Sequence, residues 1–144
     1  MDNLCSLETM KKEFQTLQQQ IERVLEFGGG HTGEQIAYDM EDADEVFLTY
    51  QYTRLLDQLD DVHRRLRYLH KKIAVEGPLM KQSNGRPAFP DGTELTSGDA
   101  CELLVADEDG PYWVFTTIEH HGRYYAKAFG FEQPIDGMQA RIRR

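Results

Sequence analysis

The side chains best suited to metal chemistry in this sequence are its five histidines and two cysteines. His120 and His121 are adjacent, and adjacent side chains of a strand point to opposite faces, so these two are poorly placed to share an ion. His63 and His70 are seven residues apart, which in a helix is about 10 Å of rise and too far for one metal. The two cysteines lie far apart and form no CxxC motif. We therefore expect no metal site and no cofactor.

The segment with the best residues for acid–base catalysis is Glu119-His120-His121. A catalytic base needs an orienting partner and a nucleophile or substrate groove, and the sequence offers no such constellation. The glycine-rich segment 28–33 has no lysine and follows a predicted helix rather than a strand, so it is better interpreted as a hinge than as a phosphate-binding loop. We expect a protein that is not an enzyme.

Length and charge narrow the class of protein further. The chain has 144 residues, enough for one ordinary domain or two very small ones. The formal net charge is −9, which argues against direct binding to nucleic-acid phosphates. No apolar run is long enough for a membrane span or a signal peptide, and the chain starts on an acidic Met1-Asp2-Asn3. A cytoplasmic protein without membrane contact is expected.

Two long amphipathic helices are predicted in the first half, over residues 4–26 and 41–74. Each has an apolar stripe with alternating spacings of three and four, the a/d pattern of a coiled coil. The stripe residues are Leu7, Met10, Phe14, Leu17, Ile21 and Val24 in the first helix, and Leu48, Tyr52, Leu55, Leu59, Val62, Leu66, Leu69 and Ile73 in the second. Joined by a glycine-rich loop, the two should form an antiparallel, coiled-coil-like hairpin. Leu25, Phe47, Leu56 and Tyr68 widen the apolar face beyond one seam, which favours a homodimer through the helices or docking on the second half.

The apolar period changes to two after a polar linker at residues 79–85. Short predicted strands and close turns fill the rest of the chain, which suggests a small closed or half-closed antiparallel barrel of the SH3-like kind. The fold class is therefore predicted as α+β, with a helical hairpin over 1–78 and a small barrel domain over 86–144.

Several segments of this second half resemble a small bacterial domain of unknown function. They are Arg86-Pro87-Ala88-Phe89, Glu94 to Asp99, Glu102 to Val105, Trp113, Thr117 to His120, Tyr124-Tyr125 and Gly137 to Ile142. The resemblance covers about residues 85–143, and it implies a protein encoded on a phage, plasmid or conjugative element. It carries over no catalytic residue. More loosely, the order of strands and turns is similar to Tudor and other SH3-like barrels, which supports the fold more than any peptide-binding role.

Aromatic residues supply the first candidate partner surface. They are Tyr112, Trp113, Phe115, Tyr124 and Tyr125. In the strand predicted at residues 112–119, Trp113 and Phe115 share one face, and Tyr112 lies on the other. Whichever face is outward would offer an apolar platform to a peptide, to the chain's own hairpin or to a partner protein.

Acidic residues supply the second candidate surface. Glu41, Asp42, Asp44 and Glu45 precede the second helix, where acids suit the helix dipole. Our leading hypothesis is a protein-interaction or assembly module, with itself or a host enzyme as partner. The alternative is an acidic nucleic-acid mimic, an anti-CRISPR-like inhibitor of a host nucleic-acid enzyme. A weaker alternative is a nucleic-acid-binding accessory protein, using the basic tail of Arg141, Arg143 and Arg144.

Overall fold

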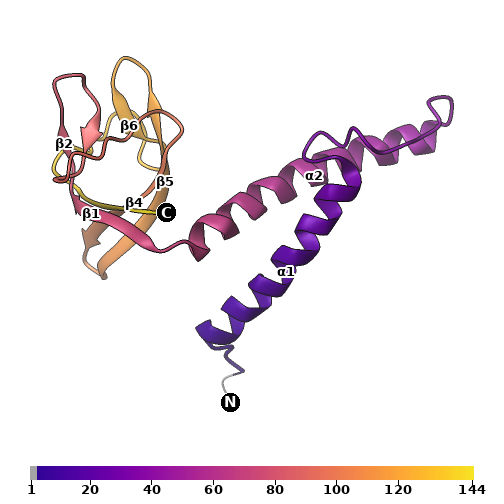
Figure 1. Ribbon diagram of the computed structural model, residues 1–144, viewed down its shortest axis with the longest axis horizontal. Coiled ribbons are helices and arrows are strands. Elements are labelled where there is room, and N and C mark those ends of the chain that lie inside the picture. The colour runs from indigo at the N-terminus through magenta and orange to yellow at the C-terminus, as the bar shows by residue number, and fades with distance from the viewer. Residues whose placement is uncertain (1–2) are drawn as a thin grey trace. The chain divides into compact units, whose positions relative to one another are not determined.

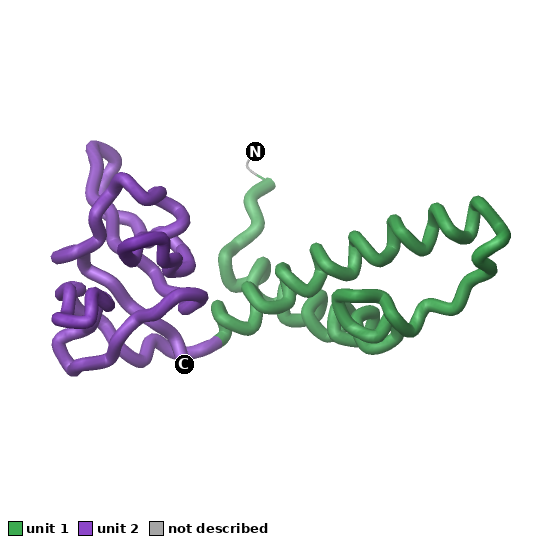
Figure 2. The backbone as a smooth tube through the Cα atoms, turned by 90° about the horizontal axis from the view of Figure 1, so that it is seen from above, with its two compact units in different colours: residues 1–70 green, residues 71–144 purple. Residues whose placement is uncertain are grey.

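The computed structural model describes residues 3–144 and divides the chain into two compact units. One unit ends at His70 and the other extends from Lys71 to Arg144, as the two colours of Figure 2 show. The first unit contains two helices, and the second contains the strands (Figure 1). The predicted α+β class, with a helical hairpin before a β domain, is thus confirmed. Among the residues described, no helix has the length and apolar character needed to cross a membrane.

Helix α1 covers Leu7–Gly28 and has a well-defined cap at each end. The Ser6 side chain accepts a hydrogen bond of 3.0 Å from the Thr9 backbone N–H, which satisfies one of the first helical donors. At the other end Gly29 has φ 81° and its backbone N–H donates to the carbonyls of Leu25 and Glu26. A left-handed residue of this kind is usually glycine because a Cβ would be strained there.

The loop between the helices lies tightly against the second one. At Gly33, which has φ +66°, an added Cβ would lie 2.9 Å from Thr53 Oγ1. The glycines of the predicted hinge therefore serve a helix cap and a close approach of the loop backbone to side chains of α2.

Helix α2 covers Ala43–His70 and begins with an acidic cap. Asp42 Oδ1 accepts hydrogen bonds from the backbone N–H groups of Asp44, at 2.9 Å, and Glu45, at 3.4 Å. The helix ends at His70, so the prediction of a helix to residue 74 was too long. The β-branched Ile73 and Val75 instead belong to strand β1, where pairing with another strand outweighs the helical periodicity of the sequence.

The second unit is a five-stranded antiparallel sheet and not a closed barrel, whereas the sequence predicted a closed or half-closed one. Its five strands lie in the order β1-β7-β4-β5-β6, and strands β2 and β3 form a separate pair. The strands are β1 (Ile73–Pro78), β2 (Met80–Lys81), β3 (Pro87–Ala88), β4 (Ala100–Asp107), β5 (Gly110–His120), β6 (Tyr124–Ala126) and β7 (Gln139–Arg143). Strand β6 has three residues and pairs with β5, and β1 pairs with β7, so β1 and β6 are the two edges of the sheet.

The segment predicted as a linker, 79–85, is part of the β unit. It includes strand β2, and Leu79 is almost completely buried in the core of the unit. The boundary between the units follows His70, earlier than the hairpin limit of residue 78 expected from the sequence. The core residues are Leu79, Phe89, Leu95, Cys101, Leu103, Ile118, Ala126, Ile135, Ala140 and Ile142.

Candidate interaction surface

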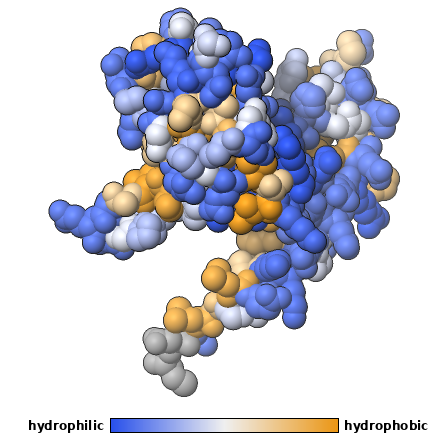
Figure 3. Space-filling view, turned by 60° about the vertical axis from the view of Figure 1, so that its left-hand side comes forward, coloured by the Kyte–Doolittle hydropathy of each residue, from blue (hydrophilic) through white to orange (hydrophobic). Residues whose placement is uncertain are grey.

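The apolar stripes of the hairpin are largely exposed. The buried seam consists of Ile21 and Leu66 from the stripes, together with Leu25 and Leu56 from positions beside them. Nine stripe residues keep between 39 and 51% of their surface exposed, namely Met10, Phe14, Leu17, Val24, Leu48, Tyr52, Leu55, Val62 and Leu69. Figure 3 shows hydrophobic side chains, in orange, at the surface of the chain close to its N-terminal end. We call these nine exposed stripe residues the apolar face of the hairpin.

Two grooves mark where this face is hollowed. The larger has a volume of about 620 Å³ and lies between the start of α1 and the end of α2. Its lining includes Phe14 and Leu7 from α1, and Val62, Leu66 and Leu69 from α2. Because both stripes contribute to the groove, they lie on the same side of the hairpin.

The smaller groove lies toward the loop end and has a volume of about 330 Å³. Val24 and Phe27 from α1 line it with Tyr52, Leu55 and Leu59 from α2. Contiguous apolar surface of this kind is rare on a protein that acts alone, and typically marks an interaction site.

The predicted acidic cluster is exposed, but part of it serves the local fold. Asp42 caps α2, and the preceding Asp39 accepts a 2.9 Å hydrogen bond from the Glu41 backbone N–H. Asp44 and Glu45 lie in the first helical turn, where a negative charge stabilises the helix dipole. Helix initiation therefore accounts for the position of these acids.

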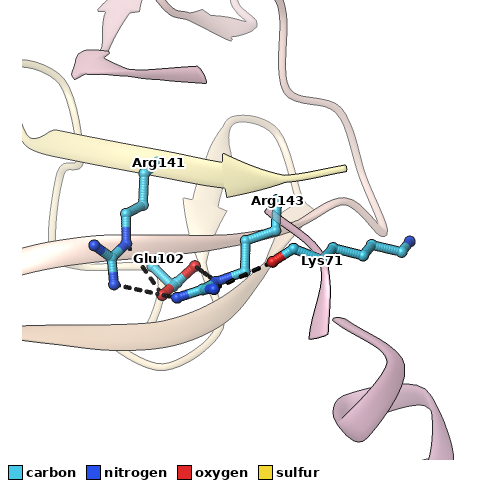
Figure 4. A network of polar contacts seen from close by, with 4 residues as sticks. All are labelled: Lys71, Glu102, Arg141 and Arg143. Atoms are coloured by element: carbon cyan, nitrogen blue, oxygen red, sulfur yellow. Dashed lines mark hydrogen bonds and ion pairs between the residues drawn. The ribbon is translucent and has the colours of Figure 1, made fainter. Parts of the chain in front are cut away.

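In the β unit, the charged group of Glu102 lies between two arginines. Glu102 Oε1 accepts from Arg141 Nε and Nη2 at 3.1 and 3.0 Å, and Oε2 accepts from Arg143 Nε at 3.0 Å (Figure 4). Arg143 also donates to the backbone carbonyl of Lys71 at 3.3 Å. Glu102 has 6% of its surface exposed, so most of its hydration has been replaced by these charge-assisted hydrogen bonds.

The two faces of β5 differ in burial, and the sequence had predicted which residues share a face but not which face is outward. Ile118 and Thr116 face the core, so Trp113 and Phe115 lie on the opposite face of the sheet. The Arg141 guanidinium lies 4.1 Å from the centre of the Trp113 ring. Trp113 is therefore part of the charged network around Glu102 rather than a bare apolar platform. The tail arginines 141 and 143, considered for nucleic-acid binding, are committed to the same network.

The three candidate tyrosines lie in three different environments. Tyr112 is exposed near the β4–β5 turn, and a hydrogen bond with the Asp107 carboxylate raises its pKa. Tyr124 packs against the core, and the Arg86 guanidinium beside its hydroxyl, 3.5 Å away, lowers its pKa. Tyr125 contacts Phe131 edge to face. The structure does not gather these residues into one binding surface.

The histidines make separate contacts. His63 Nε2 of α2 forms a 3.0 Å hydrogen bond with Glu22 Oε1 of α1, and this hydrogen bond lowers the pKa of the Glu22 carboxyl. The His120 ring contacts the Tyr124 ring at a tilted angle, while His121 contacts Phe131 edge to face. Within residues 3–144, no cluster of three or more histidine, cysteine, aspartate or glutamate side chains is arranged to hold a metal.

The two cysteines are expected to differ sharply in reactivity. Cys101 is completely buried, and burial raises the pKa of its thiol to about 12, whereas Cys5 is exposed. Because the thiolate is the reactive species, a thiol reagent at pH 8 should modify Cys5 alone in the native chain and both residues in denaturant. Counting the modified thiols by mass spectrometry tests this. Rapid native modification of Cys101 would contradict it.

Sequence reasoning missed the Glu102 network. The available signal was a single acid inside the apolar segment Cys101 to Ala106, together with two arginines spaced by two in β7. Residues two apart in a strand share a face, so Arg141 and Arg143 had to lie side by side. The pairing of β7 with β4, which places them over Glu102, could not be read from the sequence.

The chain is thus an α+β protein in which a hairpin with an open apolar face precedes a small antiparallel β domain. Residues 77–142 match the family model described as "Domain of unknown function (DUF5348)". The C-terminal half therefore contains a small domain of unknown function, and the match lies within the β unit. Comparisons with curated proteins and with solved structures gave no match.

Proposed function

We propose that the protein is a non-enzymatic protein-interaction and assembly module, and that the apolar face of the hairpin binds its partner. The observation that supports this most is the exposure of nine stripe residues on α1 and α2. A helix pair gains most of its stability by burying its apolar face, so a face left open is costly to keep unless a partner covers it. The resemblance of the C-terminal half supports a protein encoded by a bacterial mobile element, and the sequence features given above support a place in the cytoplasm.

The test is affinity purification of the tagged full chain from a bacterial lysate, with and without nuclease treatment. Leu55→Glu places a charge within the apolar face, whereas Tyr50→Glu places the same charge on an exposed residue of the opposite side of α2. We expect a protein, either untagged copies of the chain or another protein, to be recovered in both conditions. Its recovery should be lost with Leu55→Glu and kept with Tyr50→Glu.

The competing interpretations give different results in the same experiment. Replacing Glu41, Asp44 and Glu45 by their amides keeps the Asp42 cap and removes three exposed charges. If only these amides abolish recovery, and added salt does so too, the protein is an acidic mimic, because exposed charges are screened over about 10 Å at 0.1 M salt. Loss of all recovered protein on nuclease treatment would favour the nucleic-acid-binding alternative.

A further inference from the structure

We propose that the partner of the hairpin is a second copy of this chain, and that the two α2 helices pack antiparallel about a two-fold axis near Asp57. This inference rests on the proposed function, because it specifies what covers the apolar face. Two hairpins packed in this way form a four-helix bundle, a common arrangement for helices with a/d stripes.

The spacing of the stripe on α2 supports self-pairing. In an antiparallel pair, a positions of one helix lie opposite d positions of the other. With the axis at Asp57, Leu55 lies opposite Leu59 of the second copy, and Tyr52 lies opposite Val62. The same register brings Leu48 of the second copy to Leu66, on the wall of the larger groove. In each of these three pairs, an apolar side chain of one copy therefore faces an apolar side chain of the other.

The distribution of charge along α2 favours the antiparallel orientation of the two α2 helices. Residues 41–56 carry four acids and one base, whereas residues 58–70 carry three bases and two acids and are followed directly by Lys71 and Lys72. An antiparallel pair places the acidic start of each helix against the basic end of the other. The alternative two-fold arrangement, with the two α2 helices parallel, would bring like charges together at both ends, which is destabilising.

The first test is the mass of the purified full chain in solution, measured by sedimentation at several concentrations. We expect twice the 16.7 kDa of one chain. Leu55→Glu places two glutamates next to the axis and should weaken the dimer at least about tenfold, a factor that corresponds to about 1.4 kcal/mol. Tyr50→Glu, a matched change on the opposite side of the helix, should leave the dimer intact, and circular dichroism should show full helix content in both variants.

The second test is the orientation of the helices. Spin labels on single cysteines at Tyr50, Asp57 and Arg64 would lie one heptad apart and point in the same direction. In a Cys5→Ser background only the introduced cysteine reacts, because Cys101 is buried with a raised pKa. The distance between the two labels of a dimer should be shortest at 57. Labels at 50 and 64 should be further apart, with an axial offset of roughly 21 Å from the 1.5 Å rise per residue.

Three results would overturn this inference: a monomer at every concentration, a dimer that Leu55→Glu leaves unchanged, or equal label distances at the three positions. A monomer whose hairpin still captures a different protein, in a manner sensitive to Leu55→Glu, would reject the second copy as partner and leave the proposed function standing. A monomer that captures nothing would reject both.

Discussion

Replacing Glu102 by glutamine is expected to destabilise the β unit by about 3 kcal/mol, because removing one partner of a buried ion pair leaves the opposite charge uncompensated. The side chain of Glu102 is 7% exposed, and those of Arg141 and Arg143 are 17 and 20% exposed. Glutamine has nearly the same shape, so packing is kept while the negative charge between the two guanidinium groups is lost. The arginines would then repel one another in surroundings where water screens them poorly.

The chain contains a convenient reporter for this experiment. Trp113 is its single tryptophan, and its ring lies against Arg141, so its fluorescence in a urea titration reports the unfolding of the network itself.

Glu76→Gln is the matched control, because Glu76 pairs with Arg141 in the register of β1 and β7 but is exposed. The control should change stability by less than about 0.5 kcal/mol. Equal unfolding midpoints for Glu102→Gln and the natural chain would show that the network contributes nothing net.

Replacing Leu56 by aspartate is expected to destabilise the hairpin by at least about 4 kcal/mol, the sum of lost apolar packing and of burying a carboxyl group. Leu56 is 5% exposed and belongs to the seam, where an added Cβ on Gly28 would lie 2.6 Å from its Cδ1. A carboxylate at this position would lie against Gly28 on the buried side of the seam, where its hydration is poor. The loss should exceed that of a stripe substitution such as Leu55→Glu, because Leu55 remains about half exposed.

Circular dichroism at helical wavelengths during urea denaturation measures this effect. Gln58→Asp introduces the same residue two positions along α2, at an exposed site, and accounts for the poor helix propensity of aspartate. The control should keep nearly the full unfolding midpoint. If Leu56→Asp behaves like Gln58→Asp, the seam described for the hairpin is not the one that stabilises it.

The helical half could be predicted well because its determinants are local. Ser6, Gly29 and Asp42 mark helix ends through hydrogen bonds to residues close by in the sequence. What the sequence could not decide is which apolar residues the two helices bury against one another. Leu25 and Leu56, which lie beside the stripes, are buried in the seam with Ile21 and Leu66. The heptad pattern does not decide this, because one pattern is compatible with more than one packing of two helices.

In the β half, the sequence predicted the main strands but not whether the sheet closes into a barrel. Alternation along residues 101–106 and 112–119 indicates strands and predicts which residues share a face, but it does not say which face is buried; the structure buries the face of Ile118 and places Trp113 on the other. Whether the sheet closes depends on pairings between strands distant in sequence, which alternation does not encode. For the same reason the Glu102 network was not predicted, since it needs β7 beside β4.

The position of β1 in the sheet bears on the order of events during synthesis. Strand β1 begins at Ile73, yet its neighbour in the sheet is β7, at Gln139–Arg143. At translation speeds of 5–20 residues per second, roughly 4 to 14 seconds separate the emergence of α2 from that of β7. Helices with local contacts fold far faster than this, whereas a sheet whose first strand pairs with its last must wait for loop closure over the whole unit. The hairpin therefore folds while the β unit is still an incomplete nascent chain, so the self-association proposed above would begin cotranslationally, between neighbouring ribosomes on one message.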